Sequence, residues 1–289
     1  ETKYRQRYVD LIVNERTRDT FRKRSLIIQK VREYLYNQGF IEVETPMLHT
    51  QASGANARPF MTHHNALDMD LTLRIAPELH LKRLMVGGLN EKIFELSRCF
   101  RMIELYQSYV DYNEMMVLTE NLVAYVAQEV LGTTKIKYGE NEIDLTPPWD
   151  RKTMLGGIKE YTGVDFGEFF TAKEAYDRAK AMHVEVDEEM NWGQIVEAVF
   201  EAKVEPTLPV HIIDYPREIS PLAKVHRDND RLTERFETRV NGWEIANAFS
   251  ELTDPIDQRH RFEAQALAKA NGDEEAMSID EDYINALEY

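Results

Sequence analysis

The chain has 289 residues, with 35 Lys and Arg against 51 Asp and Glu, which gives a formal net charge of −16. Hydrophobic residues make up 43% and charged residues 30%, an ordinary globular composition that excludes wholesale disorder. The acidic balance argues against a surface that binds nucleic acid throughout. No apolar run is long enough to cross a bilayer or follows the N-terminus as a signal peptide would, so we expect no membrane span and no secretory signal.

The single cysteine, Cys99, excludes an internal disulfide and a cysteine metal cluster. This cysteine usage suits a reducing compartment, so we expect a cytoplasmic protein. The length is enough for one large domain or two modest ones.

The first fifty residues combine a basic segment with a long helix. Tyr4 to Leu11 carries Arg5 and Arg7, which could contact RNA or form a solvated entry segment, and both interpretations stay open. Apolar residues at helical spacing predict a helix over about 17–38, closed by Gly39. Alternation predicts a strand over 40–44 that ends before Pro46.

The next segment alternates between flexible and regular patterns. Small residues over 51–59, Gly54 among them, predict a loop whose backbone can approach a ligand closely. A strand is predicted over 71–75, and a helix starts near Pro77, where Glu78 suits the first turn. Residues 93–109 resemble one strand without a turn, far longer than the usual strand of about 5–6 residues. We therefore expect a turn segment to be missing near Arg101.

The second half predicts an α+β fold with a mainly antiparallel sheet. Helical patterns cover 113–130 and 256–271, strand patterns cover 141–145 and 210–216, and an acidic segment closes the sequence. Residues 149–206 are rich in helix formers broken by glycines, which predicts a small helical insertion.

The clearest local signal is a hairpin at Asn241-Gly242, between strand patterns over 235–240 and 243–249. A two-residue turn pairs Arg239 with Glu244 and makes Glu237 and Glu244 diagonal neighbours on one face. Two such carboxylates could hold Mg²⁺ against a nucleotide phosphate, or could be solvated and offset by Arg239. Both interpretations remain open from spacing alone.

Strict alternation places Asn247, Phe249 and Glu251 on the face opposite Glu244. If all four residues serve one site, the strand must bulge near Ala246. Neither a glycine-rich phosphate loop, an H-E-x-x-H zinc motif nor a G-x-S-x-G elbow occurs in the sequence. Residue patterns alone therefore predict an α+β enzyme with an acidic site, for which Mg²⁺ is one candidate cofactor.

Several blocks together resemble the class II aminoacyl-tRNA synthetases, and within them the bacterial-type lysyl-tRNA synthetases. They follow the family order and cover nearly the whole chain. The blocks are Tyr4–Leu11, Gly39–Pro46, Ala57–Phe60, His63–Asp68, Arg74–Leu79 and Asn247–Leu252.

This resemblance implies an antiparallel class II sheet of six strands flanked by helices, in a homodimer with the segment around Pro46 at the interface. It implies a connection from a missing anticodon-binding domain over 1–16 and a catalytic domain over 17–289, with 149–206 inserted and the third motif absent after Tyr289. The implied reaction joins lysine and ATP into lysyl-adenylate, then passes lysine to tRNA(Lys), with Mg²⁺ as cofactor.

The resemblance also implies roles for single residues. Arg101 would be the catalytic residue and contact both the ATP α-phosphate and the lysine carboxylate, a task that suits a bidentate guanidinium. Glu237 and Glu244 would bind Mg²⁺ and ATP, and Glu78 and Glu251 would receive the lysine ε-ammonium. Two further sets would complete the lysine site: Tyr106 and Phe249 around the aliphatic stem, and Gly54, Glu104 and Asn247 at the α-amino and carboxylate ends.

Three alternatives remain at this stage. One is the lysine ligase paralogue that modifies a translation elongation factor. Another is an aspartyl- or asparaginyl-tRNA synthetase, which should present a cation to the substrate side chain, whereas Glu78 and Glu251 present anions. The last is a non-catalytic, synthetase-like scaffold dimer, which the absent third motif would favour.

Overall fold

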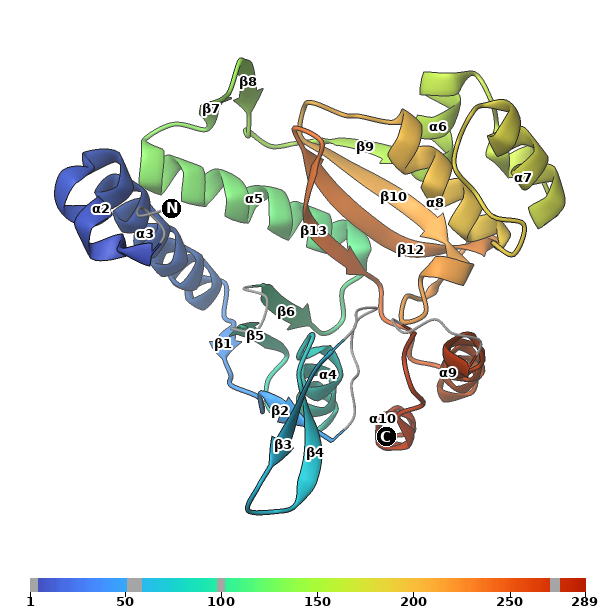
Figure 1. The fold of residues 1–289 in the computed structure, drawn as a ribbon, viewed down its shortest axis with the longest axis horizontal. Coiled ribbons are helices and arrows are strands. Elements are labelled where there is room, and N and C mark those ends of the chain that lie inside the picture. The colour runs from blue at the N-terminus through green and yellow to red at the C-terminus, as the bar shows by residue number, and fades with distance from the viewer. Residues whose placement is uncertain (1–4, 51–58, 98–101, 271–275) are drawn as a thin grey trace.

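The structure is a computed structural model that describes residues 5–50, 59–97, 102–270 and 276–289 (Figure 1). The long helix α5 (Tyr112–Leu131) runs across the middle of the molecule in Figure 1. In this view the larger sheet lies at the right-hand end of α5, and two small sheets lie below α5 with α4 (Glu78–Val86), α9 (Pro255–Ala270) and α10 (Glu281–Ala286).

The N-terminal part supplies three helices and two three-stranded sheets, ordered β1-β5-β6 and β2-β4-β3. Its elements are α2 (Arg7–Val13), α3 (Glu15–Asn37), β1 (Ile41–Glu42), β2 (Leu48–His49), β3 (Phe60–His64), β4 (Met69–Leu73), α4 (Glu78–Val86), β5 (Lys92–Leu96) and β6 (Ile103–Gln107).

The C-terminal part contains the larger sheet, in the order β11-β12-β10-β9 with β13 paired to β12, and the hairpin β7-β8. Its elements are α5 (Tyr112–Leu131), β7 (Lys135–Tyr138), β8 (Asn141–Asp144), β9 (Asp150–Thr153), α6 (Met154–Thr162), η1 (Phe166–Glu168), α7 (Ala172–Ala181), α8 (Trp192–Lys203), β10 (Val210–Pro216), η2 (Arg217–Ile219), β11 (Val225–His226), β12 (Asn229–Val240), β13 (Trp243–Phe249), α9 (Pro255–Ala270) and α10 (Glu281–Ala286).

The predicted α+β class is confirmed, and so are the long helix near 17–38, the helix after Pro77 and the hairpin at Asn241-Gly242. The turn residues Asn241 and Gly242 both have positive φ, 54° and 78°, as a type I′ turn requires. The apparent long strand over 93–109 is two antiparallel strands, with Glu95 opposite Glu104. The residues between them, 98–101, lie outside the described part of the chain. That a turn segment is missing near Arg101 stays a prediction.

The predicted, mainly antiparallel strand pairing is confirmed, but the strands differ from a single antiparallel sheet of six strands in two ways. The described strands form separate sheets instead of one sheet of six strands, and two strand pairs, β1–β5 and β9–β10, are parallel. Each parallel pair has long connecting segments with helices between its strands, which is the length that a parallel crossover needs. Hairpin patterns in a sequence reveal neighbours along the chain, and these two pairs are not such neighbours.

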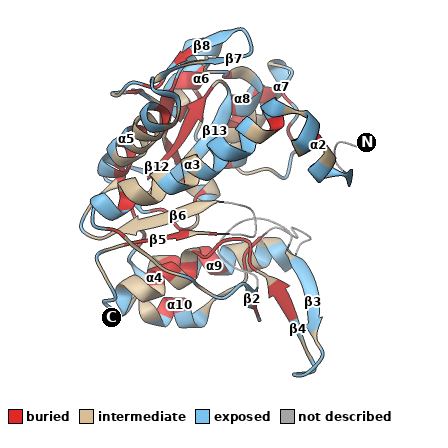
Figure 2. Ribbon diagram, turned by 90° about the vertical axis from the view of Figure 1, so that its left-hand side faces the viewer, coloured by how far each residue is buried: buried red, intermediate tan, exposed pale blue. Residues whose placement is uncertain are grey.

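Different helices cover the two faces of the larger sheet. On one face, Phe236 of β12 packs with Tyr112, Met115 and Met116 of α5. On the other face, Ile212 of β10 joins the apolar core formed by α6, α7 and α8. Figure 2 shows buried residues in red along β12 and the inner sides of α4 and α9, while β3 is exposed. Within the described residues, no helix is both long and apolar enough to cross a membrane.

A buried ion pair ties the two small sheets together. Arg74, which follows β4, contacts Glu95 of β5 at 2.6 Å, and both side chains are almost fully buried. Arg74 also donates to the Thr45 hydroxyl at 2.7 Å, and that hydroxyl donates to the second Glu95 oxygen. These contacts hold the chain just before α4, and so set where Glu78 begins that helix.

Replacing Arg74 should therefore be costly. In Arg74→Met the Glu95 carboxylate stays buried without its cation, and we expect the free energy of unfolding to fall by about 3–5 kcal/mol, measured by urea unfolding. The matched control is Arg32→Met, which removes the more exposed pair with Glu42 and should cost about 1 kcal/mol or less. Equal losses in the two variants would contradict this assignment.

Candidate functional site

The β12–β13 hairpin carries a bulge that places six polar, charged or aromatic side chains on one face. Val240 pairs with Trp243 and Arg239 with Glu244, as the sequence predicts, but Thr238 pairs with Ala246, so Ile245 is the extra residue. Beyond it, Glu237 pairs with Asn247 and Arg235 with Phe249. Because paired residues share a face, Glu244, Asn247 and Phe249 lie on the same face of the hairpin. The bulge near Ala246 that the sequence analysis required for one shared site is therefore confirmed. We call this set, Arg235, Glu237, Arg239, Glu244, Asn247 and Phe249, the β12–β13 face.

Glu237 lies between two arginines on this face. Arg235 Nη2 donates to its Oε1 at 2.8 Å, and Arg239 Nη2 donates to its Oε2 at 2.7 Å. Arg239 also binds Glu201 of α8, and Arg235 Nε donates to Asn247 Oδ1 at 3.2 Å. Burial and the charge of Glu237 raise the pKa of Glu244 above its usual value. The face thus alternates carboxylates and guanidinium groups.

A second cluster gathers around the ammonium group of Lys82 on α4. Lys82 Nζ lies 2.7 Å from Glu78 Oε1, one helical turn earlier, and 2.5 Å from Glu251 Oε2. The Glu251 side chain is 35% exposed, but the oxygen that faces Lys82 is buried. Two backbone hydrogen bonds hold the extended segment around Glu251 in place: Ser250 N donates to Glu234 O, and Leu252 N donates to Leu222 O.

Aromatic rings and a third carboxylate complete what we call the carboxylate cluster (Glu78, Lys82, Glu104, Tyr106, Phe249, Glu251 and Tyr283). The centroids of the Phe249, Tyr283 and Tyr106 rings lie 5.1, 5.9 and 6.0 Å from Lys82 Nζ, close enough for cation–π attraction. The Tyr106 hydroxyl donates to Glu104 Oε2 at 3.1 Å.

The carboxyl groups of this cluster are shifted toward their neutral forms. Burial and the charge of Glu78 raise the pKa of Glu104 from 4.5 to about 8. Burial raises the pKa of Glu251 to about 7, although the charge of Lys82 opposes that shift. Perturbed carboxyl groups in one place are typical of functional sites.

The structure brings most of the predicted site residues into these two groups. Glu78, Glu104, Tyr106, Phe249 and Glu251 surround Lys82, whereas Glu237, Glu244 and Asn247 lie on the β12–β13 face. Phe249 belongs to both groups and joins them. Gly54 and Arg101 lie outside the described residues.

Sequence reasoning missed Lys82, Arg235 and Tyr283. The spacing of Lys82 four residues after Glu78 was an available signal, because such pairs share a helix face. Arg235 could have been found by extending the alternation from Glu237. Nothing in the pattern marks Tyr283, which reaches the cluster from α10.

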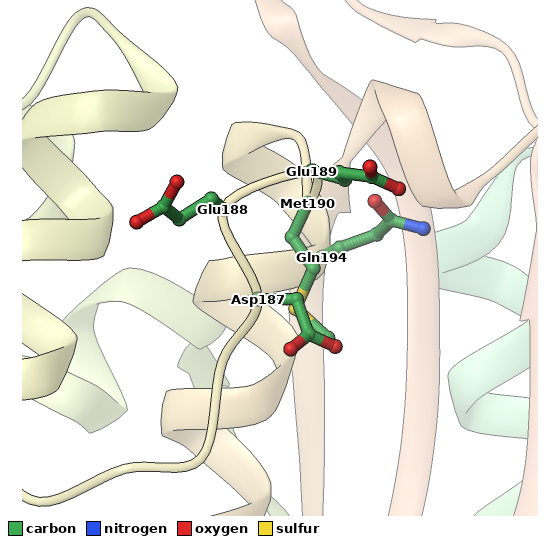
Figure 3. A pocket seen from close by; sticks show the side chains of 5 residues that line it. All are labelled: Asp187, Glu188, Glu189, Met190 and Gln194. Carbon is green, nitrogen blue, oxygen red and sulfur yellow. The ribbon is translucent and has the colours of Figure 1, made fainter.

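A separate hollow lies at the start of α8, lined by Asp187, Glu188, Glu189, Met190 and Gln194 (Figure 3). None of its lining residues belongs to the predicted site. Its acidic residues are neighbours along one loop, which is an ordinary solvated surface.

A comparison with protein families decides which family this is. The model of the class II tRNA synthetases for D, K and N matches residues 1–289, the whole chain. The chain belongs to this family.

Curated relatives of this class II synthetase chain are lysine–tRNA ligases. The protein of Carboxydothermus hydrogenoformans is 56% identical over all of this chain and 62% of its own length. Those of Thermoanaerobacter pseudethanolicus and Nostoc punctiforme are 55% identical, over 60% and 54% of their lengths. The chain therefore spans about 60% of the length of the first relatives. The first alignment runs over 304 positions against 289 residues here, so that relative carries residues that this sequence lacks.

The donor set of this synthetase's β12–β13 face fits Mg²⁺ in one specific way. Among the described residues, no group of three or more His, Cys, Asp or Glu side chains could hold a metal ion alone. Mg²⁺ at nucleotide sites is commonly held by one or two carboxylates together with phosphates and water. Glu237 and Glu244 supply that number, so they would hold the ion only with a nucleotide present.

The Glu104 pKa predicts how stability depends on pH. Folded protein keeps this proton up to about pH 8, whereas an unfolded chain loses it near 4.5, so the free energy of unfolding falls as pH rises between these values. Glu104→Gln removes that contribution. Between pH 5 and pH 9, the free energy of unfolding of the variant should rise by roughly 2 kcal/mol relative to that of wild type, as measured by urea unfolding. A fully buried group would contribute ~1.4 kcal/mol for each pH unit between the two pKa values, and the half-buried Glu104 contributes less.

The control for this measurement is Glu91→Gln, which changes an exposed glutamate just before β5. The free energy of unfolding of Glu91→Gln should depend on pH in the same way as that of wild type. A Glu104→Gln curve parallel to wild type would show that Glu104 ionises normally.

Proposed function

We propose that this protein is a lysine–tRNA ligase, which activates lysine with ATP and transfers it to tRNA(Lys). The observation that carries the proposal is the convergence of Glu78 and Glu251 on one ammonium group beside the rings of Phe249 and Tyr106. A site that binds one ammonium group between paired carboxylates suits the ε-ammonium of lysine. The names of the curated relatives support the same function.

The charge of the cluster argues against the sister specificities of the family. Aspartate needs a cation at the end of the side-chain site, and asparagine needs a neutral partner. Glu78, Glu104 and Glu251 would repel the first and leave buried carboxylates unpaired with the second.

In the proposed first step, an oxygen of the lysine carboxylate attacks the α-phosphorus of ATP. A new phosphorus–oxygen bond forms while the bond to pyrophosphate breaks, giving lysyl-adenylate. No side chain need act as a nucleophile, so this chain's residues bind, orient and neutralise charge. Glu78 and Glu251 would hold the ε-ammonium, Glu104 and Asn247 the α-amino end, and Arg101 with Gly54 the carboxylate end.

Mg²⁺, when bound, would neutralise phosphate charge in this reaction. Glu237 and Glu244 would hold the ion, and Arg235 and Arg239 keep the Glu237 side chain in place through the two hydrogen bonds to its oxygens. In the second step lysine passes from the adenylate to the tRNA, and AMP leaves.

We also propose a homodimer that forms through α2 and α3 and the strand that follows. Large apolar side chains are exposed along these helices, as a subunit interface requires. They are Tyr8, Ile12, Val13, Phe21, Ile27 and Tyr36. A soluble, cytoplasmic homodimer suits an enzyme of translation.

The domain assignment stays part of the proposal: a connection over 1–16 and a catalytic domain over 17–289, with 149–206 inserted. In support, α6, α7 and α8 form one apolar core of their own against β9 and β10, between two strands that pair directly.

The deciding experiment is amino-acid-dependent ATP–pyrophosphate exchange with the full-length protein and Mg²⁺, tested with each amino acid. We expect exchange with lysine alone, followed by transfer to tRNA(Lys). Exchange with aspartate or asparagine would overturn the assignment of Glu78 and Glu251. Exchange with lysine followed by transfer only to a protein would indicate the elongation-factor ligase. No exchange with any amino acid would indicate a non-catalytic scaffold.

The side-chain site predicts a selective defect in Glu251→Gln. Loss of one carboxylate from the pair should raise the KM for lysine roughly 30-fold or more, which corresponds to about 2 kcal/mol, with little change in the KM for ATP. The control, Glu263→Gln on the exposed side of α9, should leave both constants unchanged. Equal changes in the two KM values would argue against a role at the lysine end.

The metal assignment predicts a different defect in Glu237→Gln. The Mg²⁺ concentration for half-maximal exchange should rise roughly tenfold or more, because a ligand loses its charge. Glu201→Gln removes the outer partner of Arg239 but no proposed ligand, and it should shift the Mg²⁺ requirement less. A larger shift in Glu201→Gln would place the ion elsewhere.

A further inference from the structure

Lys82 occupies an unusual place for a residue of the protein itself. Its ammonium group lies where the proposed site would receive an ammonium group of the substrate, between Glu78 and Glu251. The Lys82 side chain is only 6% exposed. Burial disfavours its charge, but Glu251 and Glu78 outweigh that effect and raise the pKa of Lys82 well above its usual value. It is therefore a permanent cation inside the cluster.

Two roles are compatible with this position. Lys82 could fill the ammonium site only when substrate is absent, and leave when lysine binds. Alternatively, it could stay in place and share its carboxylates with the substrate. The two roles predict opposite effects of removing Lys82 on the affinity for lysine.

The contacts favour the permanent role. Lys82 is bound one turn after Glu78 on the same helix, and the Phe249, Tyr283 and Tyr106 rings lie within 6.0 Å of its ammonium group. Expelling it would leave a buried ammonium group without the partners that offset its desolvation. Each carboxylate has a second oxygen, and the Glu251 side chain is partly exposed, so an incoming ammonium group can reach the pair.

The charge count supports the same role. Among the described residues of the carboxylate cluster, three carboxylates face one cation, which leaves two negative charges when all are ionised. Free lysine brings two ammonium groups, and its own carboxylate is assigned to Arg101. With Lys82 in place, the cluster keeps one negative charge for each ammonium group once Glu104 and Glu251, whose pKa values are raised to about 8 and about 7, have lost their protons.

We propose that Lys82 is a positioning and specificity-determining residue, which holds Glu78 and Glu251 side by side and sets the cluster to accept a substrate with two ammonium groups. This inference rests on the proposed function, because it concerns the lysine site of that enzyme. Lys82 acts through the two glutamates and takes no part in the chemical step.

Removing the cation should raise the pKa of Glu251, whose carboxylate lies closest to Lys82. Glu78, Glu104, Glu251, Tyr106 and Tyr283 surround the position, and Glu95 lies opposite Glu104 on β5. Without Lys82, the carboxylates repel one another and the pKa of Glu251, already about 7, rises further. Glu251 then holds a proton at neutral pH in addition to the one that Glu104 already holds, and the cluster has lost negative charge that the substrate needs.

The test is calorimetric binding of L-lysine to the full-length protein without ATP, from pH 6 to pH 9. Lys82→Met keeps the side-chain length and removes the charge. We expect it to bind lysine at least tenfold more weakly than wild type at pH 7, about 1.4 kcal/mol, with the defect shrinking toward pH 9. Lys159→Met, which removes an exposed cation paired with Asp165, is the control and should match wild type.

Two further variants separate charge from packing. Lys82→Arg keeps a cation, so its affinity should follow the wild-type pH dependence even if a larger group weakens binding overall. Lys82→Ala leaves the space of a propylammonium ion, and added propylammonium chloride should strengthen lysine binding to this variant while it competes with lysine in wild type.

Several results would overturn the proposal. Equal or tighter lysine binding by Lys82→Met would show that Lys82 is a displaceable occupant or has no role. The same pH dependence in Lys82→Met and Lys82→Arg would show that its charge is irrelevant, and this comparison still decides if one variant melts at lower temperature. If wild type itself binds no lysine, the proposed function fails, which is distinct from wild-type binding with an unaffected Lys82→Met.

Discussion

The structure depends on a balance of charge inside the protein. Glu78, Glu104 and Glu251 come from a helix, a strand and an extended segment far apart in the chain, and buried carboxylates are stable only near cations or donors. Lys82 and the Tyr106 hydroxyl supply those partners. Around them, Leu79, Leu222, Phe262 and Tyr283 form one apolar cluster that packs α4 against α9 and α10. The polar contacts select the arrangement, and the apolar contacts stabilise it.

One extra residue in β13 connects this cluster to the larger sheet. Without the bulge at Ile245, strict alternation would place Glu244 on the opposite face from Asn247 and Phe249. With it, one face carries the two proposed metal ligands, the asparagine and the ring that touches Lys82. The bulge thus makes the proposed nucleotide end and the proposed amino-acid end continuous along a single strand.

Sequence patterns predicted the features that depend on residues close together in the chain, namely the turn, its strand pairing and the helices. Asn241-Gly242 specified the turn, the turn specified that Arg239 pairs with Glu244, and helical spacing located α3, α5 and α9. Glu78 and Glu251 came instead from the family resemblance, because no periodicity links residues so far apart. The bulge at Ile245 was only a conditional expectation, since neither glycine nor proline marks it. Lys82 was missed because an exposed helical lysine and a buried one look alike in sequence.

The two ends of the site handle acidic side chains in opposite ways. On the β12–β13 face, Glu237 is neutralised by Arg235 and Arg239, so guanidinium groups remain beside the place proposed for phosphates. In the carboxylate cluster, three acids share one lysine, so acidic groups outnumber the cation. Phosphate is an anion and the lysine side chain a cation, so each end carries the charge that its proposed substrate group requires. Phe249, between them, contributes no charge to either, and this separation lets one strand serve two ligands of opposite sign.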